Sequence, residues 1–299
     1  MAITASGTAR RSLGSALVAS ARPRQWLKNL LVFAAPATGR VLLQPEVFAR
    51  VFATFVAFTL VSSGVYYVND IIDRHEDAQH PRKRFRPIAA GEIPVRLAWF
   101  VGILLLLGGV LAAFATGGAG LVAVVGGYVI LAMSYAIVLR GVALLDMAGI
   151  AGGFLLRAVA GGVAVDVPLS SWFLIVATFA SLFVAASKRH AELVRVGEAR
   201  GDHRSTLAGY SESYLRFVQY SSSTACITAY CLWAFEGAVM APLWSGLSII
   251  PFVLGVFRYA LLVDTGRGES PEDLVFGDAS LVGFGFTWIA LLAVGLLLS

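Results

Sequence analysis

The chain has 299 residues, of which 58% are hydrophobic and only 14% are charged, and its mean hydropathy is +0.78. A soluble domain of this length carries about 25% charged residues, so the composition excludes an ordinary soluble protein and predicts a multi-pass membrane protein. The net charge of +5 requires no nucleic-acid partner, because cytoplasmic loops and contact with anionic lipids of the bilayer account for it.

The N-terminal stretch contains basic residues but too weak an apolar segment for a clear signal peptide. We expect residues 1–20 to form a mobile cytoplasmic tail, with a short interfacial helix within it as the alternative, and residues 21–299 to form a single transmembrane domain. A membrane-spanning helix requires about 20 mostly apolar residues. Nine segments satisfy that requirement: 26–43, 46–68, 95–116, 119–139, 142–164, 168–187, 213–236, 243–263 and 279–299. The sequence thus predicts an all-α membrane protein with nine transmembrane helices.

The basic residues predict the orientation of these helices. If the N-terminus is cytoplasmic, all but three of the 23 lysines and arginines lie on the cytoplasmic side. The exceptions are Arg40 and Arg50, which fall outside, and Arg157, which falls within the fifth span. The positive-inside rule therefore predicts a cytoplasmic N-terminus, and nine spans place the C-terminus outside. Most carboxylates also lie on the cytoplasmic side, so we expect any chemistry there.

The fifth span carries this arginine between two pairs of glycines. Gly152-Gly153 and Gly161-Gly162 predict close packing of helices, and no strand precedes them that would suggest a nucleotide-binding loop. A charge within a span is normally buried against protein and paired. We expect Arg157 to pair with an acid on another helix, and the alternative is that it contacts a ligand in a cavity.

Three aspartates follow the second span at helical spacing. Asp70, Asp73 and Asp77 occupy positions i, i+3 and i+7, so they share one stripe if the helix continues past the membrane surface. Asn69 adds a neutral oxygen to this stripe. Such oxygen ligands suit Mg²⁺, which completes its shell with water and substrate phosphate. The spacing fits equally well a solvated helix end whose acids pair with the basic residues that follow.

A basic segment comes directly after the acids. Residues 80–87 read HPRKRFRP and supply four cations, and arginine side chains bind phosphate oxygens with two parallel hydrogen bonds. Metal-binding acids beside phosphate-binding bases indicate a diphosphate site at the membrane surface.

The pattern N-D-x-x-D-x-x-x-D at residues 69–77, followed by R-P-x-x-x-G at residues 86–91, resembles the UbiA superfamily of intramembrane prenyltransferases. Arg22-Pro23-Arg24 at the start of the first span, and Tyr135 with Arg140 at the end of the fourth, also match that superfamily. The resemblance implies a nine-helix bundle with a cytoplasm-facing active-site cavity. It also implies a Mg²⁺–diphosphate site, with metal ligands among Asn69, Asp70, Asp73 and Asp77.

Segments 22–36, 152–173, 187–193 and 210–217 resemble one branch of the superfamily more closely. That branch transfers 5-phosphoribosyl from phosphoribosyl diphosphate (PRPP) to polyprenyl (decaprenyl) phosphate and releases diphosphate, on the pathway to the lipid-linked arabinose donor for cell-wall arabinan. Typical superfamily members carry a second aspartate-rich motif after the sixth span. Residues 187–192 instead read SKRHAE, and the extra cations suit a substrate with several phosphates.

This resemblance implies two sets of functional residues. The catalytic set comprises Asp73, Asp77, Lys83 and Arg84. The substrate-binding set comprises Arg22, Arg24, Lys28, Asn69, Arg86, Tyr135, Arg140, Lys188, Arg189 and Glu192. The three cations at the start of the first span fit equally well a role in anchoring it at the interface. No histidine is assigned to catalysis, because the acceptor phosphate is already an anion and needs no general base.

Two other functions compete with this one. A UbiA-type prenyltransferase would join a prenyl diphosphate to an aromatic or other acceptor, but the missing second acidic motif disfavours it. A transporter would carry its acids near the membrane midplane on broken helices, whereas these aspartates follow a span. The sequence leaves open whether copies of the chain form a homo-oligomer.

Overall fold

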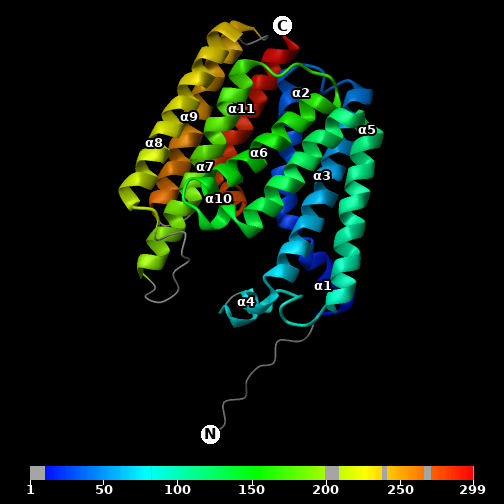
Figure 1. The fold of residues 1–299 in the computed structure, drawn as a ribbon. Coiled ribbons are helices and arrows are strands. Elements are labelled where there is room, and N and C mark those ends of the chain that lie inside the picture. The colour runs from blue at the N-terminus through cyan, green and yellow to red at the C-terminus, as the bar shows by residue number, and fades with distance from the viewer. Residues whose placement is uncertain (1–10, 82, 199–208, 238–240, 266–270, 299) are drawn as a thin grey trace.

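A computed structural model describes residues 11–81, 83–198, 209–237, 241–265 and 271–298. All the regular elements within these residues are helical, and Figure 1 shows them as a bundle of long, roughly antiparallel helices. The chain starts with α1 (Leu13–Ser20), the 3₁₀ helix η1 (Pro23–Phe33) and α2 (Ala34–Thr38). The remaining elements are α3 (Pro45–Ile72), α4 (Arg74–Gln79), η2 (Lys83–Phe85), α5 (Val95–Ile137), η3 (Leu139–Gly141), α6 (Leu145–Ala164), α7 (Ser171–Glu198), α8 (Glu212–Leu232), the π-helical turn η5 (Trp233–Gly237), α9 (Pro242–Asp264), α10 (Pro271–Gly277) and α11 (Ala279–Leu297).

Six of the described helices are long and apolar enough to cross a membrane, namely α3, α5, α6, α7, α9 and α11. Helix α5 has 43 residues and leaves helical geometry at Gly117 and Gly118, so it covers both the third and the fourth predicted spans. Gly118 has a φ of 60°, which glycine adopts without steric cost. The protein is therefore a helical, multi-pass membrane protein, and the count of nine spans stays a prediction.

The first predicted span does not form one long α-helix. Residues 23–33 are a 3₁₀ helix and residues 34–38 a short α-helix. Pro36 lacks a backbone N–H and cannot continue the hydrogen-bond ladder. The chain nevertheless packs against the bundle here, since Val32 and Ala35 are buried.

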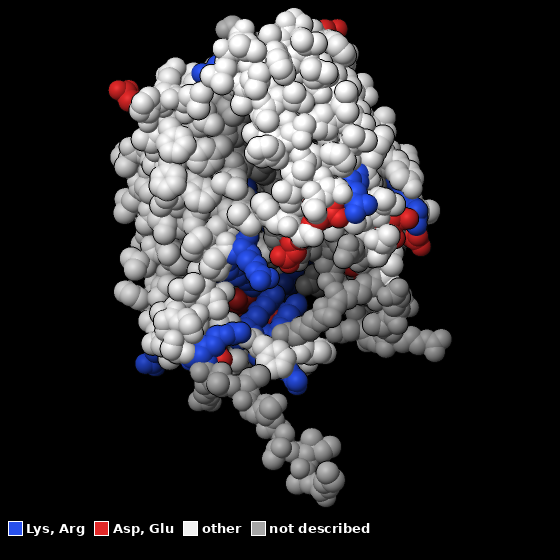
Figure 2. All heavy atoms as spheres, turned by 180° about the vertical axis from the view of Figure 1, so that it is seen from behind, with Lys and Arg blue, Asp and Glu red and all other residues white. Residues whose placement is uncertain are grey.

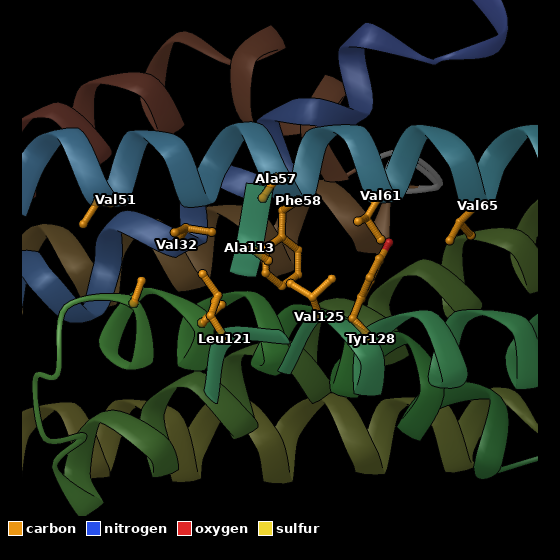
Figure 3. Packing of buried hydrophobic residues seen from close by; sticks show 12 residues of the cluster. Val32, Val51, Ala57, Phe58, Val61, Val65, Ala113, Leu121, Val125 and Tyr128 are labelled. Carbon is orange, nitrogen blue, oxygen red and sulfur yellow. The ribbon is translucent and has the colours of Figure 1, made fainter. Parts of the chain in front are cut away.

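The central core lies between η1, α3, α5 and α6. Figure 3 shows Phe58 and Val61 of α3 facing Val125 and Tyr128 of α5. The rings of Phe58 and Tyr128 are 5.5 Å apart between centroids. This packing fixes the second half of α5 against α3, and Tyr128 takes part in the cavity described below.

Glycines allow the closest helix contacts. A Cβ atom on Gly161 would lie 1.8 Å from the backbone oxygen of Val32, and one on Gly109 would lie 2.4 Å from Val61 Cγ2. Only a residue without a side chain permits such approach. The predicted close packing is confirmed for Gly152, Gly161 and Gly162 of the fifth span, whereas a Cβ on Gly153 would make only ordinary contacts.

Part of the predicted N-terminal tail forms the short helix α1, Leu13–Ser20. Residues 1–10 lie outside the described residues, but α1 is an ordered part of the bundle. Ala16 and Ser20 are buried, and the hydroxyl of Tyr67 donates to the backbone oxygen of Leu17 at 2.7 Å. Ala16 and Leu17 of α1 pack against residues of α3 and α5, whereas Leu13 and Val18 are exposed.

Candidate active site

A cavity of about 620 Å³ opens between η1, α3, α5, α6 and α7. Figure 2 shows basic and acidic side chains gathered in one hollow on an otherwise largely uncharged face. Among the described residues, eight cations line the cavity: Arg22, Lys28, Lys83, Arg86, Arg140, Arg157, Lys188 and Arg189. The carboxylates that line it within this part of the chain are Asp70, Asp73 and Glu76. The wall therefore carries a clear excess of positive charge, which favours an anionic ligand with several negative groups.

The aspartate stripe is only partly formed, because α3 ends at Ile72 and α4 begins at Arg74. Asp73 lies at the junction. Its backbone N–H donates to the backbone oxygen of Asn69 at 2.9 Å, and its backbone oxygen accepts from the backbone N–H of Asp77 at 2.8 Å. These two bonds keep successive turns close to helical. Asp70 and Asp77 consequently reach the same cation, while Asp73 faces a different one.

Arg86 joins the two outer aspartates. Its Nη1 lies 2.6 Å from Asp77 Oδ2 and 3.2 Å from Asp70 Oδ1. Asp70 also accepts from Arg22, and Lys83 Nζ lies 3.7 Å from Asp77. Both carboxylates are almost fully buried, at 2% and 1% exposed. Their mutual repulsion is thus offset by basic residues, as the alternative interpretation of the spacing predicted, but the two side chains are buried and not solvated.

Asp73 pairs with Arg140 from the turn between α5 and α6. Arg140 Nη1 donates to both carboxylate oxygens, at 3.0 and 2.9 Å. The hydrogen bond with Asp73 raises the pKa of Arg140, so this guanidinium stays charged. Asp73 remains partly open to the cavity, with 15% of its side chain exposed.

Asn69 supplies an oxygen that no described residue satisfies. Its Oδ1 is buried without a hydrogen-bond partner, and the residue lines the cavity one turn before Asp73. An unsatisfied buried acceptor costs about 1–3 kcal/mol, a cost that a bound cation or donor would remove. The described residues contain no group of three His, Cys, Asp or Glu side chains placed to hold a metal. A metal here would therefore combine this amide oxygen with few carboxylates and with ligand oxygens, as Mg²⁺ commonly does.

Lys188 and Arg189 of α7 differ in their surroundings although they are adjacent. Lys188 is half-buried in the cavity wall. Arg189 is 3% exposed and makes ion pairs with Asp146 and Glu192. It also donates to the hydroxyl of Tyr135 at 2.7 Å. Arg189, Tyr135 and Glu192 thus belong to one buried polar network centred on Asp146.

Sequence reasoning did not assign Asp146 to the site. It is fully buried at the start of α6 and accepts from both Arg189 and Tyr135, the latter at 3.1 Å. The available signal was a lone carboxylate beside an apolar run, which is costly within a membrane unless it is paired.

Four predicted site residues do not line the cavity: Arg24, Asp77, Arg84 and Glu192. Arg24 is 85% exposed and lies 3.9 Å from Asp273. Arg84 is exposed and its guanidinium stacks on Phe85, 4.9 Å from the ring centroid. The other two are carboxylates held behind the wall by basic residues that do line it.

Arg157 does not pair with an acid in the described chain, contrary to expectation. Its partners are Asn29 Oδ1 at 2.7 Å, the Gly153 oxygen at 2.6 Å and the Tyr128 hydroxyl at 2.9 Å. The sequence could not show these contacts, because they join helices that are distant in the chain.

The sequence pattern of the UbiA prenyltransferase family matches residues 30–288. The chain belongs to the UbiA prenyltransferase family. UbiA relatives named decaprenyl-phosphate phosphoribosyltransferase occur in Mycobacterium tuberculosis and Corynebacterium glutamicum. The first is 41% identical over 93% of this chain and 93% of its own length. The second is 38% identical over 93% of this chain and 86% of its own length.

Solved UbiA structures share the fold. A UbiA homolog from Archaeoglobus fulgidus bound to GPP and Mg²⁺ superposes with a TM-score of 0.70, covering 94% of this chain and 98% of the homolog at 17% identity. The same homolog bound to DMAPP and Mg²⁺ gives a TM-score of 0.69. A divalent metal is thus found in this family, and the protein is a membrane enzyme of the UbiA type.

Proposed function

We propose that this UbiA enzyme transfers 5-phosphoribosyl from PRPP to a polyprenyl phosphate such as decaprenyl phosphate, releasing diphosphate. The observation that carries this proposal is the charge of the cavity wall, where the described residues place eight cations and three carboxylates. A prenyl diphosphate brings one anionic group, whereas PRPP and a polyprenyl phosphate together bring three. The names of the relatives with about 40% identity support the same donor and acceptor. We place the reaction on the pathway to a lipid-linked arabinose donor.

The orientation of the bundle in the membrane is also part of this proposal. The N-terminal α1 and the end of α11 lie at opposite ends of the bundle (Figure 1), as an odd number of spans would require. Lys83 and Arg86 of the basic segment after α3 line the cavity, and the positive-inside rule assigns such segments to the cytoplasm. PRPP would then enter from the cytoplasm, while the polyprenyl chain stays in the bilayer of the cell membrane.

Mg²⁺ fits the donor atoms at the end of α3. Asn69, Asp70 and Asp73 line the cavity, with Asp77 behind them. The Asn69 Oδ1 has no partner among the described residues, and the Asp73 side chain is 15% exposed. When bound, Mg²⁺ would act as a Lewis acid that stabilises the negative charge of the leaving diphosphate. Arg86 and Lys83 hold Asp77 here, so these cations are placed to turn toward the diphosphate oxygens.

The chain's own residues account for the rest of the reaction. The bond from C1 of the ribose to diphosphate breaks as a phosphate oxygen of the acceptor bonds to C1, through a transition state with oxocarbenium character. Lys83 and Arg86 neutralise the leaving diphosphate, whereas Arg84 is exposed and does not line the cavity. Arg22 and Lys28 line the wall near the start of η1, where they can contact a phosphate group of either substrate. No proton needs to be removed, because the attacking oxygen is already anionic.

Labelled substrates test this function. The purified protein in lipid nanodiscs would be given ribose-labelled PRPP with polyprenyl phosphate or, separately, labelled prenyl diphosphate with an aromatic acceptor. We expect labelled lipid and free diphosphate only from the first pair. Chelation of divalent ions should abolish the product, and added Mg²⁺ should restore it. Consumption of prenyl diphosphate without use of PRPP would instead establish the alternative prenyltransferase.

Asn69 offers a sharper test of the metal site. Asn69→Ala should raise the Mg²⁺ concentration needed for half-maximal activity while leaving thermal stability unchanged, because Oδ1 has no partner in the described chain. An unchanged Mg²⁺ requirement would remove Asn69 from the ligand set.

A further inference from the structure

Arg157 is a buried cation with neutral partners. Arg157 is 5% exposed and lies in α6, well within a candidate membrane span. Its three hydrogen bonds go to an amide, a backbone carbonyl and a phenol. No carboxylate contacts it within the described residues. Asp146, the acid on the same helix, is engaged by Arg189.

The partners of Arg157 hold it in one orientation. Asn29 is fully buried, and its Nδ2 is fixed by the hydroxyls of Thr59 and Ser62 on α3, at 3.1 and 3.3 Å. The guanidinium also lies 4.6 Å from the centroid of the Tyr128 ring. Neutral groups from η1, α5 and α6 thus position the charge without neutralising it.

The guanidinium has capacity for a ligand. An arginine carries five N–H donors, and the three hydrogen bonds described leave two of them for another acceptor. Arg157 lines the cavity together with Gly153 and Phe154. A charge buried in a membrane protein costs several kcal/mol unless it is compensated, and an anion entering the cavity would supply that compensation.

This part of the cavity lies far from the proposed metal ligands. Arg157 is eleven residues beyond Asp146 along α6, which corresponds to about 16 Å at 1.5 Å per residue. On α3, Phe58 packs on Tyr128, which is a partner of Arg157. Phe58 lies eleven residues before Asn69, so the same length of helix separates this end of the cavity from Asn69. Both helices therefore place Arg157 at the deep end, while Asn69 and Asp73 lie at the mouth.

From this geometry we infer that Arg157 forms the floor of a phosphate-monoester subsite, separate from the diphosphate site. The inference rests on the proposed function and assigns one of its anions. Two substrate groups share this chemistry, the 5-phosphate of PRPP and the head group of polyprenyl phosphate. Each guanidinium nitrogen of Arg157 already donates once, and the second N–H groups of Nη1 and Nη2 are left for phosphate oxygens, in the bidentate manner that arginine favours.

Binding measurements with separate probes test this subsite. Wild-type protein and Arg157→Gln would be titrated in nanodiscs with PRPP, ribose 5-phosphate, polyprenyl phosphate and inorganic diphosphate plus Mg²⁺. We expect the Kd of one or both monoester-containing substrates to rise about 10- to 100-fold, as for loss of a charged hydrogen bond. The Kd of inorganic diphosphate should not change. Arg50→Gln is the matched control, because Arg50 is exposed and does not line the cavity.

The pattern of losses identifies the source of the phosphate. Weaker binding of PRPP and ribose 5-phosphate assigns the sugar phosphate, and weaker binding of polyprenyl phosphate assigns the lipid head group. Unchanged affinity for both overturns the inference, as does an equal loss of diphosphate binding. If wild-type protein itself neither binds PRPP nor transfers label, the proposed function fails instead.

Arg157→Lys covers the case in which the glutamine variant does not fold. Lysine keeps the charge but lacks the planar fork, so the affected substrate should bind severalfold more weakly while the protein stays folded. Tyr128→Phe, which removes one positioning contact and keeps the ring, should weaken the same substrate and no other. A lysine variant with both monoester affinities unchanged would also overturn the subsite.

Discussion

Arg140 donates from one nitrogen to both carboxylate oxygens of Asp73, at 3.0 and 2.9 Å, although the two residues are 67 positions apart. This pair ties the end of α3 to the turn between α5 and α6. It therefore links the acidic motif to the part of the chain that also carries Asp146 and its buried network. A carboxylate at the cavity mouth is thus held in place while 15% of its side chain stays accessible.

We predict that Asp73→Asn lowers kcat at least about 100-fold, comparable to the loss of one preorganised electrostatic contact. The amide keeps the size of the side chain but removes the charge that both Arg140 and Mg²⁺ require. Initial rates at saturating PRPP and Mg²⁺ measure the effect. Asp166→Asn is the control, because Asp166 is exposed with a φ of 54°, a conformation that asparagine tolerates. Normal turnover by the Asp73 variant would refute the proposed metal site.

Alanine substitutions at the neighbours Lys188 and Arg189 should affect different properties, substrate binding for Lys188 and stability for Arg189. Lys188→Ala should raise the KM for PRPP roughly tenfold, because a charge-assisted contact to phosphate is lost, with little change in stability. Arg189→Ala should lower the free energy of unfolding by about 3–5 kcal/mol, because it leaves Asp146 buried and unpaired. Thermal unfolding and steady-state kinetics on both variants separate the two roles.

The double variant Asp146→Leu with Arg189→Met provides the control for this pair. Apolar residues of similar size remove both buried charges together, so much of the lost stability should return. An Arg189→Ala variant as stable as the wild type would contradict the structural role of this arginine.

Gly161→Ala should destabilise the protein by about 1–3 kcal/mol, as overpacking of a close contact does. The added Cβ would lie 1.8 Å from the Val32 oxygen, so η1 has to move away from α6. Gly127→Ala is the control, because a Cβ there meets nothing within 4 Å, and alanine favours the helix. The melting temperatures of the two variants should therefore shift in opposite directions. A Gly161 variant as stable as wild type would show that the contact is loose.

Asp278 should make stability depend on pH in acid. The hydrogen bond from Arg258, with that from Leu281 N, lowers the pKa of Asp278 to about 2. The unfolded value is about 3.9, so the stabilisation is complete above that value and is lost as the pH falls toward 2. Asp278→Asn keeps the helix-capping oxygen and removes the charge. The difference in melting temperature between wild type and variant should therefore shrink from pH 5 to pH 2, and a constant difference would contradict this linkage.

Local spacing predicted a large part of the site. The stripe at residues 69–77 and the basic segment after it do line one cavity through Asn69, Asp70, Asp73, Lys83 and Arg86. The spacing could not predict that α3 ends at Ile72. Because of this end, Asp73 pairs with Arg140, while Asp70 and Asp77 share Arg86. These pairings depend on the one-residue break between α3 and α4, because the break changes which side chains come within contact distance.

The amino-acid sequence by itself determined the membrane environment, the helical architecture and the residue types of the proposed phosphate-binding site, because composition and short-range periodicity control each of these. Only the tertiary structure decided which charge meets which. It made Arg189 part of a buried network and placed Arg157 among neutral partners at the deep end of the cavity. Such pairings depend on how helices far apart in the chain rotate and pack against one another, and short-range spacing carries no record of that rotation.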